Sequence, residues 1–109
     1  ITILITGNIM KIYVISEIFV NDEDQYKKYM KLVPDTIKKY GGKYLVRGGD
    51  ILNNNLDWTP KGRIIVLEFP SIEKLDLWQN SDEYKPVKEI RLNSSTSQSI
   101  TIESGGVPF

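Results

Sequence analysis

Apolar and β-branched residues are concentrated in four short stretches of the chain, and this pattern predicts four β-strands. The stretches are residues 11–20, 43–49, 63–69 and 97–103. Between the first two, apolar residues recur every three or four positions, which predicts a helix that begins within residues 21–25 and ends before Gly41. Pro34 lies inside that helix and predicts a kink. Two shorter helical patterns, at 72–80 and 81–92, follow the third strand.

The predicted elements come in the order strand, helix, strand, strand, broken helix, strand. This order predicts an α+β fold, a ferredoxin-like βαββαβ sandwich with a four-stranded antiparallel sheet. We expect a single domain over residues 10–104 and a C-terminal tail over 105–109. Residues 1–9 precede Met10, and we expect them to be an N-terminal extension; the alternative is an additional edge strand.

The better strands are apolar on both faces. The first strand has Ile12, Val14 and Ile18 on one side and Tyr13, Ile15 and Phe19 on the other. The third strand has Ile65, Leu67 and Phe69 opposite Ile64 and Val66. Two helices cover only one face of a sheet, so the second face would leave a large apolar patch in water. We therefore predict a homodimer packed sheet to sheet; the alternative is a monomer with some exposed apolar residues.

Composition excludes several kinds of site. The chain has no Cys and no His, which excludes disulfides, thiol nucleophiles, His-based triads, proximal-His haem and Cys/His zinc sites. Basic and acidic residues balance at 14 each, so bulk charge gives no reason to expect nucleic acid or an anionic membrane. We predict no cofactor and no metal, since residues 22–24 lack the spacing of a calcium loop. No apolar run reaches transmembrane length, and we expect a cytoplasmic protein.

Several stretches, taken in order, resemble a known family. They are Tyr26 and Tyr29, residues 40–49, residues 65–71, and then Trp78, Ser81, Tyr84 and Arg91. Together they look like the small bacterial proteins catalogued as domain of unknown function 1330, in the dimeric α+β barrel superfamily. The resemblance covers about residues 11–104 and implies the same fold and a dimer. Related families include cofactor-free monooxygenases, muconolactone isomerases and haem-dependent enzymes; without any His, the haem-dependent members are poor guides.

Two carboxylates and one arginine are the catalytic candidates. Glu17 and Glu68 lie in otherwise apolar strands and share one predicted sheet face, where burial beside a second carboxylate would raise the pKa of each and make a general base or acid. Arg47 is the nearest candidate cation, and it would either stabilise a substrate anion or bridge to a carboxylate. The alternative is that each Glu pairs with a cation or hydroxyl and is structural.

Three further residues are candidates for substrate binding. Trp58 lies in a loop beside residues 53–55, where an aromatic ring would form a ligand wall, and Tyr13 would add a second ring. Trp78 and Tyr84 have helical spacing and fit a core role better. Arg91 either lines a cleft or pairs with an acidic side chain.

Two functions stay open. The superfamily resemblance implies a cofactor-free enzyme, of the monooxygenase or isomerase type, that acts on a small acidic or aromatic molecule. The alternative is a non-catalytic homodimer that binds a small molecule or has a structural role. The distinction depends on whether Glu17, Glu68 and Arg47 face an open cavity or bond only to one another.

Overall fold

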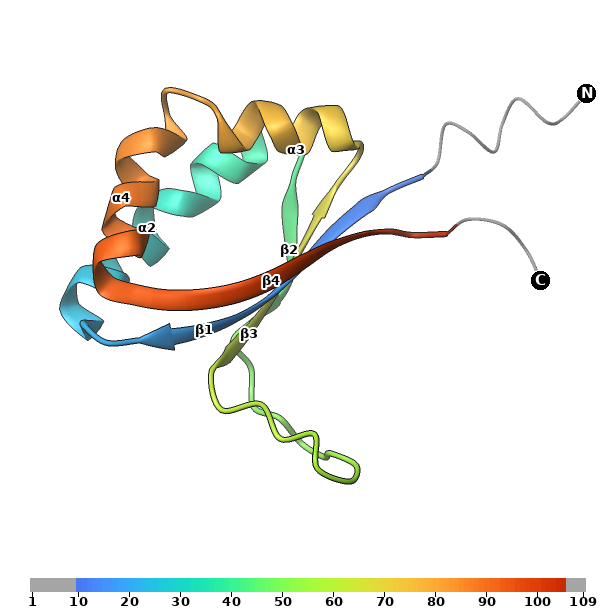
Figure 1. Ribbon diagram of the computed structural model, residues 1–109. Helices are drawn as coiled ribbons and strands as arrows, with labels where there is room; N and C mark the ends of the chain where they lie inside the picture. Colours follow the sequence, from blue (N-terminus) through green and yellow to red (C-terminus); the bar gives the residue numbers. More distant parts are fainter. Residues whose placement is uncertain (1–9, 106–109) are drawn as a thin grey trace, which may run out of the picture.

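The computed structural model describes residues 10–105, so the expected extension at 1–9 and the tail residues 106–109 lie outside the described part of the chain. Seven elements follow one another along the sequence (Figure 1): β1 (Ile12–Val20), α2 (Glu23–Lys39), β2 (Lys43–Arg47), β3 (Arg63–Phe69), α3 (Ile72–Gln79), α4 (Tyr84–Ser94) and β4 (Ser95–Glu103). This is the predicted order, including the division of the second helical region into two helices.

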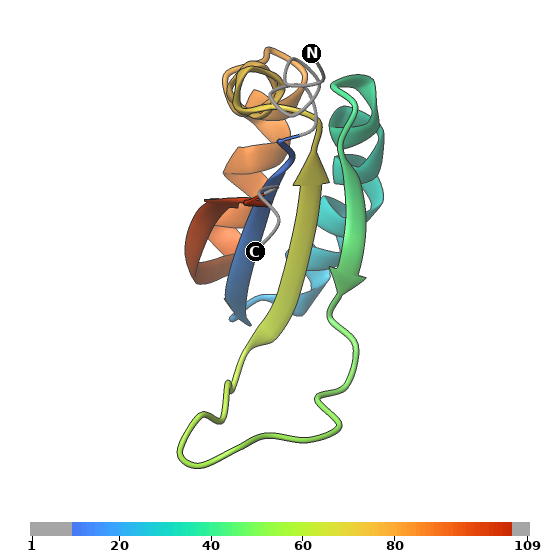
Figure 2. The ribbon, with the colours of Figure 1, turned by 90° about the vertical axis from the view of Figure 1, so that its right-hand side faces the viewer.

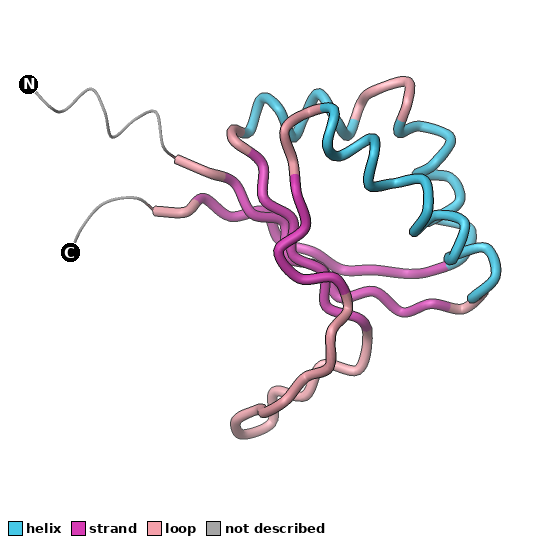
Figure 3. Tube along the Cα trace, turned by 180° about the vertical axis from the view of Figure 1, so that it is seen from behind, coloured by secondary structure: helices cyan, strands magenta, loops and turns pink. Residues whose placement is uncertain are grey.

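The four strands form one antiparallel sheet in the order β2-β3-β1-β4. The helices lie together on one side of that sheet, as Figure 1 and the reverse view in Figure 3 show. The predicted α+β, ferredoxin-like fold is therefore confirmed. We call the helix-covered side the inner face and the other side the outer face. No helix within residues 10–105 is both long and apolar enough to cross a membrane.

Local sequence signals set the ends of α2. The Asp22 side chain accepts a hydrogen bond from the Gln25 amide at 3.1 Å, which caps the first turn. After the C-cap residue Tyr40, Gly41 has a φ of 82°, and its amide donates to the Lys38 carbonyl at 3.0 Å. A residue without Cβ takes this left-handed conformation at little cost, as the sequence predicted for Gly41.

The inner face carries the core. Strand residues of one parity meet the helices there, and Val33 and Phe69 are fully buried between the layers. The other parity points to the outer face, where Ile15 is 38% exposed and Ile100, its partner in β4, is 58% exposed. The two strand faces are those expected from the alternation. Within residues 10–105, no helix covers the outer face.

The segment between β2 and β3 has no regular structure and extends away from the sheet (Figure 2). Its tip is open to solvent and carries exposed apolar side chains: Leu52 is 93% exposed and Leu56 is 89% exposed. Two contacts shape the tip, one from the Trp58 amide to the Asn55 carbonyl at 3.3 Å and one between the Asn54 and Thr59 side chains at 3.1 Å. The sequence predicted a loop or long hairpin connection here, and this segment is one.

Candidate functional site

A pocket with a volume of about 120 Å³ lies between the inner face of the sheet and the three helices. Its walls combine strand residues of the inner face, aromatic side chains from the helices, and several cations. The lining side chains most relevant to chemistry are Tyr26, Tyr29, Tyr44, Arg47, Arg63, Trp78, Tyr84, Lys88 and Arg91. None of the described residues that line the pocket carries a carboxylate.

All three arginines of the sequence line this one pocket, although they come from β2, β3 and α4. The three guanidinium groups have different surroundings. Arg47 and Arg91 are held by neighbouring groups within the protein, whereas the Nε of Arg63 is not. Of the three guanidinium groups, that of Arg63 is therefore the least engaged by other groups in the described part of the chain.

Arg47 is held by a backbone carbonyl that Pro34 leaves without a helical partner. A proline has no N–H, so a proline at position 34 gives the Met30 carbonyl, four residues earlier, no helical donor. The Arg47 guanidinium donates to that carbonyl and lies over the Tyr44 ring, with Cζ 4.6 Å from the ring centroid. Helix α2 therefore continues past Pro34, and β2 is tied to it by this arginine.

Arg91 is held by hydroxyl groups. Its Nε donates to the Tyr84 hydroxyl at 3.3 Å, and a terminal nitrogen donates to Ser97 Oγ at 3.2 Å. The Tyr84 hydroxyl also lies 3.3 Å from the Tyr29 hydroxyl. Burial opposes the charged form of Arg91, but Tyr84 and Tyr29 favour it, and the pKa of Arg91 is raised above its ordinary value. The guanidinium thus keeps its positive charge inside the fold.

Arg63 begins β3, and its Nε is buried with no hydrogen-bond partner among residues 10–105. The guanidinium packs against the backbone of Gly48, where an added Cβ would lie 2.5 Å from Arg63 Cζ. Gly48 itself has a φ of 72°, and its amide donates to the Ile64 carbonyl at 2.8 Å. The centroid of the Tyr26 ring lies 5.8 Å from Cζ. Arg63 is therefore packed in place but short of one acceptor.

The pocket's positive charge is not cancelled by its tyrosines. Burial raises the pKa of Tyr26 against the opposing charges of Arg63, Arg91 and Arg47, and burial also raises that of Tyr44, to about 12. Both side chains are therefore neutral phenols at physiological pH. With no carboxylate in its described lining, the pocket presents fixed cations to whatever enters it. Within residues 10–105 no group of three acidic side chains gathers as a metal site.

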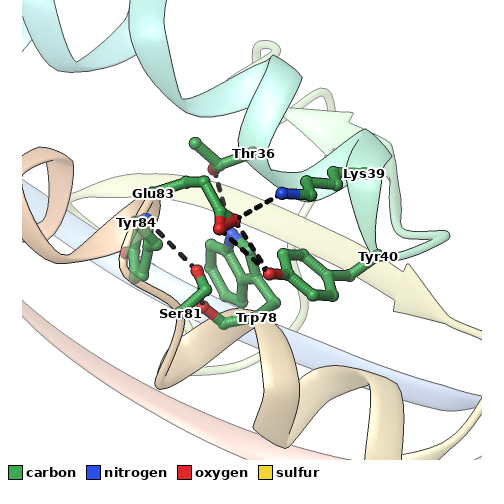
Figure 4. Close-up of polar contacts among 7 residues, drawn as sticks. All are labelled: Thr36, Lys39, Tyr40, Trp78, Ser81, Glu83 and Tyr84. Carbon is green, nitrogen blue, oxygen red and sulfur yellow. Dashed lines mark hydrogen bonds and ion pairs between the residues drawn. The ribbon is translucent and has the colours of Figure 1, made fainter.

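A polar network behind the pocket holds two of its aromatic walls (Figure 4). Trp78 donates from Nε1 to Thr36 Oγ1 at 3.0 Å, and the Tyr84 amide donates to Ser81 Oγ at 3.2 Å. Glu83 accepts from the Tyr40 hydroxyl at 2.8 Å and pairs with the Lys39 ammonium at 3.1 Å, in the same view. The network fixes the connection between α3 and α4, and so positions Trp78 and Tyr84.

The expectation that Glu17 and Glu68 form a site with Arg47 is wrong. Glu17 pairs with Ile64 and Glu68 with Tyr13 in the sheet register, so both carboxylates lie on the outer face as expected, but four residues apart along β1. That separation is roughly 13 Å at the ordinary strand rise. Arg47 faces inward because the β2–β3 register shifts at Leu45.

The expected rise in the carboxylate pKa values is also wrong. The pKa of Glu17 is lowered, because its side chain accepts hydrogen bonds from the Gly62 amide at 3.0 Å, from Gln98 Nε2 at 2.9 Å and from the Lys61 amide at 2.8 Å. It anchors the end of the loop to the sheet.

At Glu68, partial burial is outweighed by the charges of Lys11 and Lys43, each 3.5 Å away, and the pKa is lowered. Both carboxylates match the structural alternative.

Of the three substrate-binding candidates, only Arg91 lies in the pocket. Tyr13 lies on the outer face of β1, where its pKa is raised by partial burial and by hydrogen bonding to Glu68. Trp58 is 78% exposed on the loop tip. Conversely, Trp78 and Tyr84 are core residues, as expected, and they also line the pocket.

Arg63 was not among the site residues predicted from the sequence. A signal was available, because Arg63 has the same parity as Ile65, Leu67 and Phe69, the residues assigned to one face of that strand. An arginine at the start of the inner face of a strand must either find a partner under the helices or line a cavity there. Its proximity to Arg91 and Arg47 required the tertiary structure.

Comparison with solved structures supports the fold. A protein of unknown function from Rhodopseudomonas palustris has a TM-score of 0.68 at 15% identity, with 86% of this chain and 82% of that chain covered. SnoaB, a cofactor-independent oxygenase from Streptomyces nogalater, has a TM-score of 0.60 at 10% identity, with 85% and 91% covered. A conserved protein from Methanosarcina mazei has a TM-score of 0.54 at 16% identity, with 88% and 92% covered.

The search of curated proteins finds no match. The match to a family model is extensive, since it runs over residues 11–105 and so covers nearly all of the described structure. The chain therefore belongs to the family described as a domain of unknown function, DUF1330.

Proposed function

We propose that the helix–sheet pocket binds a small acidic organic molecule. The observation that carries this proposal is the gathering of all three arginines around a pocket without a carboxylate in its described lining. Guanidinium groups pair with carboxylates and other planar oxyanions through two parallel hydrogen bonds. The aromatic walls, Tyr26 and Trp78 among them, suit a ligand with an apolar or ring-shaped body.

Benzoate and its neutral isostere benzamide test this proposal. Trp78 lines the pocket and Trp58 is exposed, so a Trp58→Phe background leaves Trp78 as the reporter. We expect benzoate to change the Trp78 fluorescence in a saturable manner and benzamide to bind at least tenfold more weakly. As a control, we expect Lys38→Gln, which removes a positive charge on the exposed side of α2, to leave benzoate affinity unchanged. Equal binding of the two compounds contradicts the proposal.

A second candidate function is cofactor-free oxygenation or isomerisation of the bound anion. The same cluster of arginines favours it, because fixed cations stabilise an enolate or phenolate as charge develops. The fold shared with a cofactor-independent oxygenase is consistent with this chemistry. Since Glu17 and Glu68 lie on the other face of the sheet, the general base is not one of these carboxylates.

Oxygen uptake with a panel of phenols and β-diketones tests oxygenation, and the ultraviolet absorbance of the same reactions tests isomerisation. We expect turnover of at least one compound, lost in Arg91→Gln and retained in Glu68→Gln. Saturable binding of compounds that are never turned over would instead leave the chain as a non-catalytic binding protein.

We further propose that the chain forms a homodimer through its outer sheet face. The centre of that face is apolar and exposed, with Ile15, Val46, Ile100 and Ile102 each at least 38% exposed. Its charged residues are already partnered within the chain: Glu68 with two lysines, and Glu17 with amide groups. Paired charges lower the cost of covering this face.

Light scattering coupled to size exclusion measures the oligomer directly. We expect twice the monomer mass for the native chain at micromolar concentration and the monomer mass for Ile15→Lys, which places an unpaired charge at the centre of the face. Lys38→Gln serves as a control. A native chain that elutes at the monomer mass contradicts the dimer.

A further inference from the structure

The pocket adjoins a second, more open cavity of about 660 Å³. Four residues line both spaces: Ile18, Tyr26, Met30 and Arg63. The second cavity runs from the end of β1 and the start of α2 to the two stems of the protruding loop. Arg63 therefore borders both cavities.

The volumes indicate how a ligand would divide between them. Small-molecule sites are commonly about 300–1,000 Å³. The inner pocket, at about 120 Å³, lies well below that range, and the outer cavity, at about 660 Å³, lies within it. On its own, the inner pocket has room for an anionic group with at most one small ring, and any larger ligand must extend outward past Arg63.

The character of the lining also changes from the inner pocket to the outer cavity. The outer cavity has apolar walls from Phe19, Val20, Ile51 and Pro60, of which Phe19 is 40% and Ile51 46% exposed in the single chain. Its charged lining residues are of both signs: Glu23, Lys27, Asp50, Lys61 and the shared Arg63. In the inner pocket, all charged side chains of the described lining are cations, which favours an anion there. The outer cavity favours an apolar body.

We propose that the two cavities form one site for an amphipathic organic acid. The anionic head lies against Arg63 in the inner pocket, and the apolar body lies in the outer cavity between Met30, Phe19 and Ile51. Arg63 lines both cavities, its Nε has no hydrogen-bond partner within residues 10–105, and its packing against Gly48 holds the guanidinium in place. This assignment of the ligand class rests on the proposed anion-binding function of the inner pocket and goes further, because it requires a body that extends outward.

The test is a series of straight-chain carboxylic acids, from acetate to decanoate, titrated calorimetrically below their micelle concentrations. Straight-chain alcohols of equal length serve as neutral controls. Each methylene that enters an apolar cavity strengthens binding by up to about fourfold. Because the outer cavity is partly open, we expect about two- to fourfold per methylene for the acids, up to the length that fills the cavity, and much weaker binding of the alcohols.

Two variants separate the head from the body. Arg63→Gln is expected to weaken all acids tenfold or more while the gain per methylene persists. Ile51→Ser, in an exposed loop where the fold is least affected, is expected to leave the short acids unchanged and to weaken the longest several-fold. Circular dichroism and thermal unfolding confirm that each variant is folded before its binding is interpreted.

Three results would overturn the inference. If the short acids bind and affinity does not depend on chain length, the outer cavity does not bind the body of the ligand. The proposed anion binding in the inner pocket is then unaffected. If alcohols bind as tightly as acids, the site does not recognise an anionic head, and the proposed function is wrong as well. Native affinity for every acid in the folded Arg63→Gln variant removes Arg63 as the anchor.

Discussion

Gly48 offers a sharp test of how Arg63 is positioned. In Gly48→Ala, the new Cβ would lie 2.5 Å from Cζ of Arg63, a distance that the two groups cannot keep. The guanidinium is the mobile end of a long side chain, so it moves rather than the backbone. The substitution therefore displaces the cation that the proposed site depends on, while the sheet around it stays intact.

Two quantities distinguish this effect from ordinary backbone strain. Gly48 and Gly41 both have a positive φ, at 72° and 82°, so alanine at either position costs about 1–2 kcal/mol of folding free energy. Only at Gly48 does the new methyl group meet a guanidinium; at Gly41 it meets the Pro70 ring at 3.1 Å. A lost hydrogen bond to a charged group is worth about 1.5–3 kcal/mol, or roughly ten- to hundredfold in affinity.

The assay pairs urea unfolding with benzoate titration for both variants. We expect similar losses of stability in Gly48→Ala and Gly41→Ala, and a tenfold or greater loss of benzoate affinity in Gly48→Ala alone. If Gly48→Ala loses stability as expected but binds benzoate with native affinity, then Gly48 does not position the binding cation and the geometric argument is wrong.

Three other changes test the surrounding structure. Thr36→Val leaves the buried Trp78 indole N–H without its acceptor, and urea unfolding should show a loss of about 1–3 kcal/mol. Tyr40→Phe removes the hydrogen bond that is the largest cause of the lowered Glu83 pKa. The pKa of Glu83 is lower in the folded state than in the unfolded state. The stabilisation from this bond is therefore present above about pH 4.5 and is lost as the pH falls through the folded-state pKa. Thermal unfolding should therefore show a native-to-variant gap at neutral pH that closes in acid. Glu17→Ala should speed hydrogen exchange at the two loop amides that donate to it, measured by NMR; unchanged exchange would show that the carboxylate does not anchor the loop.

The strands, the helices and the division of alternate residues of β1 and β3 between the two faces of the sheet followed from the sequence. Alternation and helical spacing are properties of neighbouring residues, and capping by Asp22 and the turn at Gly41 depend on a few adjacent positions. The order of the elements then left few arrangements, and the ferredoxin-like sheet is one that buries the apolar positions. The sequence also showed that the outer face would remain apolar.

The site depended on contacts that no local pattern contains. The register shift at Leu45 turned Arg47 inward, and the Met30 carbonyl that Pro34 leaves without a donor gave it a partner on another element. Glu17 met loop amides instead of a second carboxylate, so its pKa fell where burial alone predicted a rise. Register, bulges and side-chain partners are set by pairing between distant segments, so only the tertiary structure brought the three arginines to one pocket.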